Sequence, residues 1–351
     1  DVSGLRAFKS ALKPGSVPLA SCLATWDFSG DPCAAPRITS FTCGITCSDG
    51  RVVQLTLDSQ GYSGELSPAI SELTHLEALD LGENDFHGPI PESISSLSNL
   101  RTLILSRNSF SGAISPSIAA IRSLETLDLS RNSLAGRIPP ELKSLSGLTR
   151  LDLSYNNLSG PLPELPKNLN ELALKANSLS GPLSESSFHE LSQLMVLELS
   201  ENSFTGVLGS WIFRLPSLQQ IDLASNSFTA VDVGAEPNGQ LVAVDLSRNK
   251  IEGFLTENFA RFTTLRSLSL SCNQFRGPIP SEYGRKGLGL QRLYLDGNYL
   301  NGSPPVAFFS GDGTLSGSLG DNCLRRCPTS SELCLKSQKP VKICQLAYGG
   351  K

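Results

Sequence analysis

Residues 100–108 read LRTLILSRN and residues 124–132 read LETLDLSRN, so two stretches share leucines at their first, fourth and sixth positions and asparagine at the ninth. This pattern occurs eleven times between Val52 and Asn298. Successive ninth positions are 21 to 25 residues apart, which is typical of a solenoid of short stacked repeats. Those positions are held by Gln60, Asn84, Asn108, Asn132, Asn156, Asn177, Asn202, Asn226, Asn249, Asn273 and Asn298.

Each repeat predicts one short strand whose leucines point inward, because side chains alternate between the two faces of a strand. Stacking the repeats about 4.8 Å apart makes a parallel sheet with a continuous core, which a single repeat cannot form. The asparagines have a separate role. A buried amide there is expected to bind the backbone groups left unpaired where each repeat turns out of its strand.

A second signature follows the asparagine and identifies a family. It has a glycine four residues after the asparagine and a proline three residues later, as in NDFHGPIP (84–91), NSLAGRIP (132–139), NNLSGPLP (156–163) and NQFRGPIP (273–280). The segment resembles the plant-specific class of leucine-rich repeats, found in receptor kinase ectodomains, receptor-like proteins and polygalacturonase-inhibiting proteins. The resemblance implies an α/β solenoid, a curved right-handed superhelix of about 11 full repeats and a degenerate last one, with disulfide caps at both ends.

Some positions and repeats depart from this consensus. The residue two places after the asparagine is aromatic in several repeats and is predicted to be core: Tyr62, Phe86, Phe110, Phe204, Phe228 and Phe275. The repeat after Asn156 is short and has Pro163 and Pro166 where an outer helical turn is expected, and Ala230 replaces the glycine of its repeat. We therefore predict a missing helical turn in the first case and an altered second strand in the other.

The cysteines delimit the predicted organisation. We predict an N-terminal capping module over residues 1–50, leucine-rich repeats over 51–322, and a C-terminal cysteine cap with a juxtamembrane-like tail over 323–351. No run of about 18 apolar residues and no basic-then-apolar leader occurs, so we expect a mature ectodomain whose solenoid is not inserted in a membrane.

Eight cysteines form two groups outside the repeats: Cys22, Cys33, Cys43 and Cys47, and Cys323, Cys327, Cys334 and Cys344. Disulfides within each group would close the apolar ends of a solenoid in an oxidising compartment. Zinc binding by either group is an alternative. We favour disulfides because the resembled family has them at both ends, and the pairing within each group stays open.

The ninth cysteine and two sequons complete this picture of the surface. Cys272 precedes Asn273, and we interpret it as a partly buried unpaired thiol rather than a reactive or intermolecular one. Asn157 and Asn301 each begin an Asn-x-Ser sequon and are predicted glycosylation sites.

Catalysis is disfavoured. The outward strand positions align carboxylates such as Asp128 with Asp152 and Glu198 with Asp222, near the separation of a retaining glycosidase pair. Any solenoid with a repeated Leu-Asp-Leu strand gives this spacing, and an open sheet implies no pocket. The three histidines lie beside no serine or cysteine nucleophile, and no phosphate-binding glycine motif occurs. We expect no enzyme activity and no cofactor.

Binding is then the expected function. The outward strand residues offer few aromatic side chains for stacking on sugar rings, so a peptide or protein is a better ligand than an oligosaccharide. Nucleic acid is disfavoured by the net charge of −4. By resemblance, the chain is the extracellular region of a plant immune or developmental receptor, at the outer face of the plasma membrane, with a SERK-type co-receptor kinase as partner. The alternatives are a secreted inhibitor similar to polygalacturonase-inhibiting proteins and a structural role in cell-wall adhesion.

Charge indicates where the ligand or co-receptor binds. Residues 1–240 have a charge balance of −10, whereas residues 241–351 have a balance of +6. Such asymmetry steers a charged partner towards one end. Five residues on or beside the later strands form the predicted site for a carboxylate or sulfate of the ligand: Arg248, Arg266, Arg292, Tyr294 and Asp296.

Overall fold

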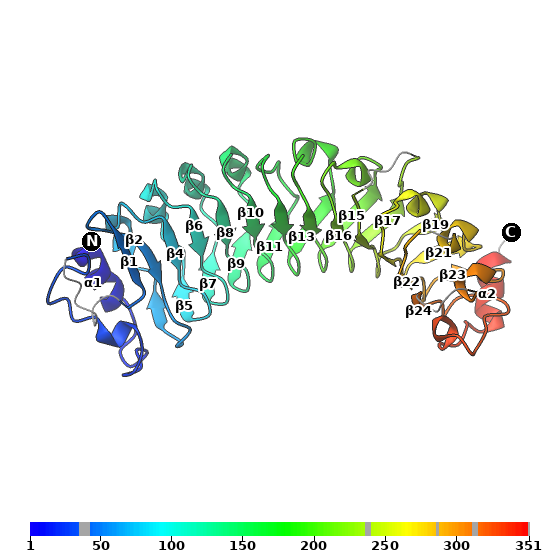
Figure 1. The fold of residues 1–351 in the computed structure, drawn as a ribbon, viewed down its shortest axis with the longest axis horizontal. Coiled ribbons are helices and arrows are strands. Elements are labelled where there is room, and N and C mark those ends of the chain that lie inside the picture. Colours follow the sequence, from blue (N-terminus) through cyan, green and yellow to red (C-terminus); the bar gives the residue numbers. More distant parts are fainter. Residues whose placement is uncertain (35–42, 236–239, 286–287, 311–314, 350–351) are drawn as a thin grey trace. The chain divides into compact units, whose positions relative to one another are not determined.

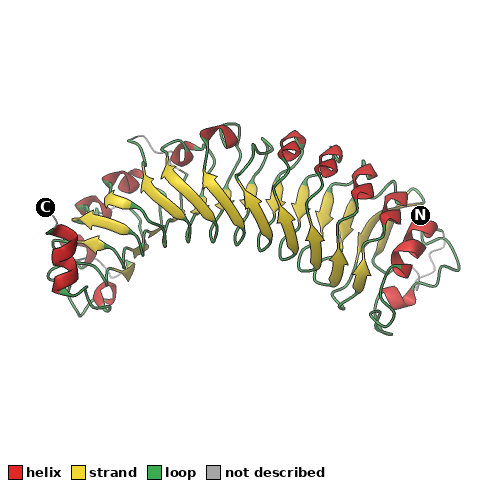
Figure 2. Ribbon diagram, turned by 180° about the vertical axis from the view of Figure 1, so that it is seen from behind, coloured by secondary structure: helices red, strands yellow, loops and turns green. Residues whose placement is uncertain are grey.

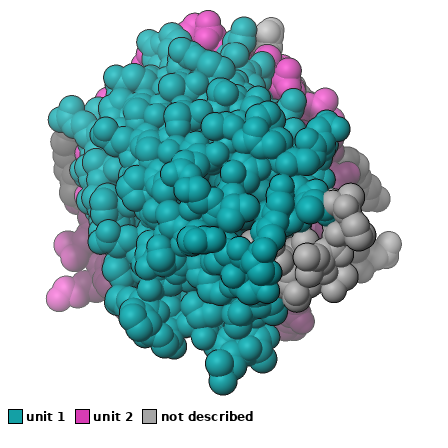
Figure 3. All heavy atoms as spheres, turned by 90° about the vertical axis from the view of Figure 1, so that its left-hand side faces the viewer, with its two compact units in different colours: residues 1–179 teal, residues 180–351 magenta. Residues whose placement is uncertain are grey.

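The protein is described by a computed structural model over residues 1–34, 43–235, 240–285, 288–310 and 315–349 (Figure 1). It divides into two compact units, residues 1–179 and 180–351 (Figure 3). Both units are stacks of short parallel strands with one strand of the main sheet per repeat, so the predicted solenoid is confirmed.

Unit 1 contains the N-terminal cap and the first repeats. Its main sheet begins with an antiparallel pair and continues in parallel: β1 (Ile45–Ser48), β2 (Arg51–Thr56), β4 (Ala78–Asp80), β6 (Thr102–Ile104), β8 (Thr126–Asp128), β10 (Arg150–Asp152) and β12 (Glu171–Ala173). The second sheet is formed by the segment after each asparagine: β3 (Ser63–Glu65), β5 (Asp85–Gly88), β7 (Ser109–Gly112), β9 (Ser133–Gly136), β11 (Asn157–Gly160) and the start of β13 (Ser178–Pro182).

Unit 2 repeats this arrangement. Its main sheet consists of β14 (Val196–Glu198), β16 (Gln220–Asp222), β18 (Ala243–Asp245), β20 (Ser267–Ser269), β22 (Arg292–Tyr294) and β24 (Ser316–Ser318). The second sheet contains the end of β13, β15 (Ser203–Leu208) and β17 (Ser227–Val231), and a separate group follows: β19 (Glu252–Phe254), β21 (Gln274–Gly277) and β23 (Tyr299–Leu300).

Short helices cover the side of the repeats away from the main sheet (Figure 2). Two are α-helices at the chain ends, α1 (Val2–Ser10) and α2 (Val341–Tyr348). The described 3-10 helices are η1 (Leu23–Thr25), η3 (Pro68–Glu72), η4 (Glu92–Ser96), η5 (Pro116–Ala120), η6 (Pro140–Ser144), η7 (Glu185–Ser187), η8 (Ile212–Arg214), η9 (Glu257–Arg261), η10 (Ser281–Gly284), η11 (Val306–Phe308) and η12 (Glu332–Cys334).

The asparagines have the predicted structural role. Asn156 is buried; its Oδ1 accepts the Leu134 amide at 2.9 Å, and its Nδ2 donates to the carbonyls of Leu129 and Leu153 at 2.9 and 3.1 Å. Each amide therefore joins its own turn to the preceding repeat. Asn322 makes the same contacts, accepting from Leu300 and donating to Leu295, so the asparagine row extends one repeat beyond the eleven recognised in the sequence.

The residue before each asparagine adopts a left-handed backbone, which the sequence did not reveal. Arg107, Arg131, Arg248 and Cys272 have φ of 54°, 53°, 54° and 55°. This conformation is costly for residues other than glycine. Side chains at this position project from the turn beyond the main sheet, where Arg107, Arg131, Arg248 and Cys272 are exposed.

The core is leucine-rich with stacked aromatic rings. All six predicted aromatic core residues are at most 1% exposed, and the rings of Phe86 and Phe110 stack at 6.2 Å. Two irregular repeats also follow prediction. No helical turn separates β11 from β12 in the described residues there, and the β15–β17 register shifts between Phe228 and Ala230.

Four disulfides hold the ends: Cys22–Cys43, Cys33–Cys47, Cys323–Cys344 and Cys327–Cys334. Every pair lies within its own group, so these cysteines form disulfides rather than the alternative zinc site. The pairing itself could not be read from the sequence.

The segment predicted to be a juxtamembrane-like tail is, through Tyr348, attached to the last repeats. The Tyr348 hydroxyl accepts the Gly277 amide at 2.8 Å and donates to the Tyr299 carbonyl at 2.5 Å. Arg276 donates to the Ala347 carbonyl at 2.9 Å. Together with Cys323–Cys344, these contacts make α2 part of the C-terminal cap.

Candidate functional site

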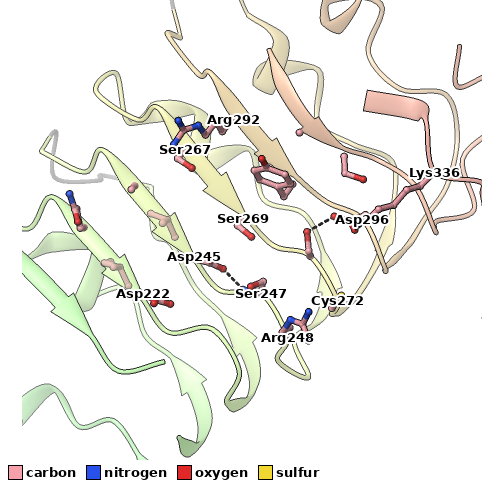
Figure 4. Close-up of a pocket in the computed structure, with 18 of the residues that line it drawn as sticks. Asp222, Asp245, Ser247, Arg248, Ser267, Ser269, Cys272, Arg292, Asp296 and Lys336 are labelled. Atoms are coloured by element: carbon pink, nitrogen blue, oxygen red, sulfur yellow. Dashed lines mark hydrogen bonds and ion pairs between the residues drawn. The ribbon is translucent and has the colours of Figure 1, made fainter. Parts of the chain in front are cut away.

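The strand face of unit 2 contains a groove of about 1090 Å³, lined by residues between Glu198 and Lys336 (Figure 4). Its floor is the row of outward residues at the third position of each strand. The register places Glu198, Asp222, Asp245, Ser269, Tyr294 and Ser318 next to one another in that order. The groove therefore changes along its length from carboxylates to hydroxyls and an aromatic ring.

The buried residues between these outward positions fix the floor. Ile221, Val244 and Leu268 point into the core and are 1–2% exposed, so the side chains on either side of them must face the groove. A register slip of one residue would exchange the two sets, and core packing therefore determines which side chains a ligand meets.

Four of the five predicted site residues line the groove: Arg248, Arg292, Tyr294 and Asp296. Arg292 starts β22 and lies beside Ser267, whereas Arg248 follows the end of β18 (Figure 4). The two guanidinium groups thus belong to opposite ends of the strands: Arg292 is at the start of its strand, and Arg248 lies beyond the end of its strand. Tyr294 lies between them and is 38% exposed.

Arg266 does not line the groove. Its Nη1 donates to the carbonyls of its near neighbours Thr263 and Leu265 at 3.3 and 3.4 Å. The guanidinium also lies over Gly289, where an added Cβ would come within 2.3 Å of Nη1. Arg266 is therefore turned towards the start of the repeat.

Asp296 has partners within the protein. Its Oδ1 accepts the Ser271 hydroxyl at 2.6 Å, and its Oδ2 lies 2.9 Å from the Lys336 ammonium. The hydrogen bond to Asp296, followed by its charge, raises the pKa of Lys336. Asp296 therefore joins the C-terminal cap to the last strands. Lys336 was missed at the sequence level because cap residues lie outside the repeat period.

The side chains of Arg248 and Arg292 differ from that of Asp296 in having no polar partner among the residues that the structure describes. Both side chains are exposed, and within the described residues neither makes an ion pair or side-chain hydrogen bond. An exposed guanidinium in a groove can accept a carboxylate or sulfate in two-point geometry. These two side chains are available for an anionic group of a ligand.

The aspartates of the floor have local roles that disfavour catalysis. One oxygen of Asp222 accepts the Ala224 amide at 3.1 Å and the other accepts the Ser200 hydroxyl at 2.7 Å, whereas one oxygen of Asp245 accepts the Ser247 amide at 2.8 Å. In unit 1, Asp128 and Asp152 accept the amides of Ser130 and Ser154 in the same way. A repeated turn contact thus accounts for the aspartate row.

The exposure of Cys272 differs from the expectation. It is the free cysteine of the described residues and is exposed at the edge of the groove, so the interpretation as a partly buried thiol was wrong. Its left-handed backbone turns the side chain outward, away from the core on which the neighbouring Asn273 packs.

The two sequons stay predictions, and their surroundings differ. Asn157 is exposed at the start of β11. Asn301 is half-buried and lines a second groove of about 640 Å³ beside α2.

Comparisons with known proteins agree with the repeat pattern. Two family models, both described as leucine rich repeat, match residues 98–158 and 167–228, and residues 75–97, 264–285 and 289–310. Together they match more than half of the chain. A relative, Receptor-like protein 7 of Arabidopsis thaliana, is 32% identical over 84 residues, which are 22% of this chain and 8% of that protein.

Solved structures extend the similarity. The plant peptide hormone receptor RGFR1 in complex with RGF2 is 32% identical with a TM-score of 0.69, over 75% of this chain and 42% of that one. The ectodomain of the Arabidopsis thaliana membrane receptor kinase GASSHO1/SCHENGEN3, in complex with CASPARIAN STRIP INTEGRITY FACTOR 2, is 26% identical with a TM-score of 0.71, over 91% and 44%. The chain thus spans less than half the length of each relative. Among the described residues, no helix has the length and apolar character needed to cross a bilayer.

Proposed function

Because the chain belongs to the plant leucine-rich-repeat proteins of the receptor-like class, we propose that it is the extracellular ligand-sensing region of a plant immune or developmental receptor. Its ligand is a peptide or protein, and its location is the outer face of the plasma membrane. The observation that supports ligand binding most directly is the groove of unit 2, in which Arg248 and Arg292 are unpaired among the described residues.

The geometry favours a peptide over a sugar or a nucleic acid. The groove is open along successive strands, which suits an extended chain, and Tyr294 is the one aromatic side chain among the described residues that line it. Its charges have both signs, from Asp222 and Asp245 to Arg292. The phosphates of a nucleic acid would lie beside these carboxylates, and the like charges would repel one another.

A co-receptor kinase of the SERK type is the second proposed partner. We propose that it binds the last repeats and the C-terminal cap, because basic residues exceed acidic ones there and the cap has exposed apolar side chains. Leu335, Val341 and Leu346 are more than 70% exposed in this region. Exposed apolar side chains of this kind are typical of protein interfaces.

The test is direct binding. The chain is immobilised, peptides from plant cell-wall fluid are captured and identified by mass spectrometry, and each synthetic peptide is titrated by calorimetry. We expect at least one peptide to bind with micromolar or tighter affinity. Reversing the charges of Arg248, Arg266 and Arg292 together should abolish that binding, most of the loss coming from Arg248 and Arg292. Unchanged affinity at low salt, with the fold intact, would place the ligand elsewhere.

The absence of catalysis is part of the proposal. The purified chain should release no reducing sugar from cell-wall polymers. Release that is lost in Asp128→Asn or Asp152→Asn would overturn the proposal and assign the carboxylate row to hydrolysis.

A further inference from the structure

The charge of the side chains that line the groove of unit 2 changes from one strand to the next. Its carboxylates lie on three successive strands, at Glu198 of β14, Asp222 of β16 and Asp245 of β18. The following strands replace the carboxylates of this row by Ser269 and Tyr294, and Arg292 joins the lining at the start of β22. Along this row of strand positions, one pole of the groove is therefore acidic, and the other has Arg292 and Tyr294. Two further exposed charges line the groove away from the row: Arg248, three residues past Asp245, and Glu332 in the C-terminal cap.

Both poles have capacity left for a ligand. Asp245 uses one oxygen for the Ser247 amide, and its other oxygen accepts no hydrogen bond from the residues that the structure describes. Asp222 accepts the Ala224 amide with one oxygen and the Ser200 hydroxyl with the other, so it offers a ligand its negative charge and remaining lone pairs. Arg292 is likewise unpaired within the described chain. The Asp296–Lys336 ion pair, by contrast, is satisfied within the protein and adds little to either pole.

The distance between the poles follows from the strand order. Asp245 and Arg292 are two strands apart, and Asp222 and Arg292 are three strands apart. Neighbouring strands are about 4.8 Å apart and an extended chain rises about 3.3 Å per residue, so these separations correspond to roughly three to four ligand residues.

We propose that the groove fixes the direction of an extended peptide that carries a basic side chain and an acidic group three to four residues apart. The basic side chain lies over Asp222 and Asp245, and the acidic group lies beside Arg292 and Tyr294. A peptide in the reverse direction places like charges together at both poles, which costs binding energy and suppresses the wrong orientation. This inference rests on the proposed peptide-binding function and adds the ligand's charge order to it.

The probe is a random octapeptide display library panned against the whole chain. We expect the selected peptides to carry Lys or Arg and Asp or Glu three to four positions apart, in a single order. Asp222→Asn with Asp245→Asn should remove the preference for Lys or Arg only. Asparagine keeps a side-chain oxygen for the amides of Ala224 and Ser247, and its amide nitrogen can donate to the Ser200 hydroxyl that now donates to Asp222, so the turns are preserved.

Further variants test each pole. Arg292→Gln should remove the preference for Asp or Glu only, and Asp245→Lys should select an acidic residue in place of the basic one. The matched control is Asp128→Asn with Asp152→Asn, which changes the same strand position in unit 1 and should leave the selected sequences unchanged. In calorimetry with a selected peptide, the Asp222 and Asp245 double variant should bind at least tenfold more weakly.

The two proposals fail in different ways. Selection of peptides in which acidic and basic residues occur in both orders, or without a basic residue, would overturn the polarity and leave peptide binding standing. Selection of no peptide above background would overturn the proposed function together with it.

Discussion

The two units have arginines at the same positions of the repeat, but these side chains differ in their interaction partners. In unit 1, Arg101 just before β6, Arg150 at the start of β10 and Arg107 before its asparagine pair with Glu125, Glu171 and Glu83 at 2.5, 3.4 and 3.4 Å. Arg131, also before an asparagine, lies 4.0 Å from the centre of the Tyr155 ring. Every one of these cations has a partner on a neighbouring repeat.

Unit 2 has arginines at the equivalent positions without those partners. Arg292 corresponds to Arg150, but the neighbour in register is Ser316 instead of an acid. Arg248 corresponds to Arg131, but Cys272 stands where Tyr155 does. Charge count alone would not reveal this difference. The comparison indicates that these four arginines of unit 1 are satisfied within the protein, whereas Arg248 and Arg292 in the groove of unit 2 are open to an external anion.

The largest expected effect concerns the disulfide caps. It tests whether the two units also differ in how strongly their ends are stabilised. Cys22–Cys43 and Cys323–Cys344 both close 21 residues of sequence separation, one in each unit. Replacing either pair by serine should lower the free energy of unfolding by about 3 kcal/mol, because loop closure costs depend on loop length. Chemical denaturation and hydrogen exchange measure this. Loss at one end with none at the other would show that the caps are not equivalent.

The asparagine row should behave alike in both units. Asn156→Ala and Asn273→Ala each remove one acceptor and one donor that bridge two repeats. We expect about 2 to 3 kcal/mol of lost stability in each case, since buried backbone groups are left unsatisfied. A change smaller than 1 kcal/mol in either variant, measured by denaturation, would refute the structural role of that amide.

A single substitution can make unit 2 resemble unit 1. Ser316→Glu places a carboxylate beside Arg292, as Glu171 lies beside Arg150. Affinity for a selected peptide should fall about tenfold, near 1.4 kcal/mol, by competition for the guanidinium. The matched control is Glu171→Ser, which removes the partner of Arg150 in unit 1 and should leave that affinity unchanged. Equal affinity in wild type and Ser316→Glu, by calorimetry, would contradict a ligand contact at Arg292.

The smallest effect concerns the carboxylate row of unit 1. Burial, assisted by the charge of Asp128, raises the pKa of Asp152, although hydrogen bonds from Ser154 oppose this. The folded protein then holds this proton more tightly than the unfolded chain, so ionisation of Asp152 removes stability as the pH rises above the ordinary aspartate pKa. Asp152→Asn should be more stable than wild type at pH 7, by about 0.5 kcal/mol or less, with no difference near pH 3. A thermal melt at both pH values decides, and equal stability at pH 7 would contradict the raised pKa.

The sequence predicted the scaffold better than the site. The regular leucines, the asparagines and Phe86 follow from periodicity, because each repeat meets the same packing requirement. The predicted site included Arg248, Arg292 and Tyr294, which line the groove, but also Arg266, which turns back onto its own backbone. The guanidinium of Arg266 lies over Gly289, which leaves room for it, and the repeat period does not indicate this contact.

Other features needed three-dimensional contacts. Lys336 reaches Asp296 across 40 positions of sequence, so no local pattern indicates their pairing. The left-handed backbone before each asparagine has no glycine to mark it at Arg248 or Cys272. That backbone explains why Cys272 is exposed.

The central claim, that unpaired arginines of unit 2 hold the ligand whereas the paired arginines of unit 1 do not, has one direct measurement. A peptide selected on the wild-type chain is titrated by calorimetry against Arg248→Gln with Arg292→Gln, and against the position-matched Arg131→Gln with Arg150→Gln. We predict at least a tenfold loss of affinity in the first double variant and an unchanged affinity in the second. Equal losses in both, or a loss confined to the unit 1 variant, would contradict the account.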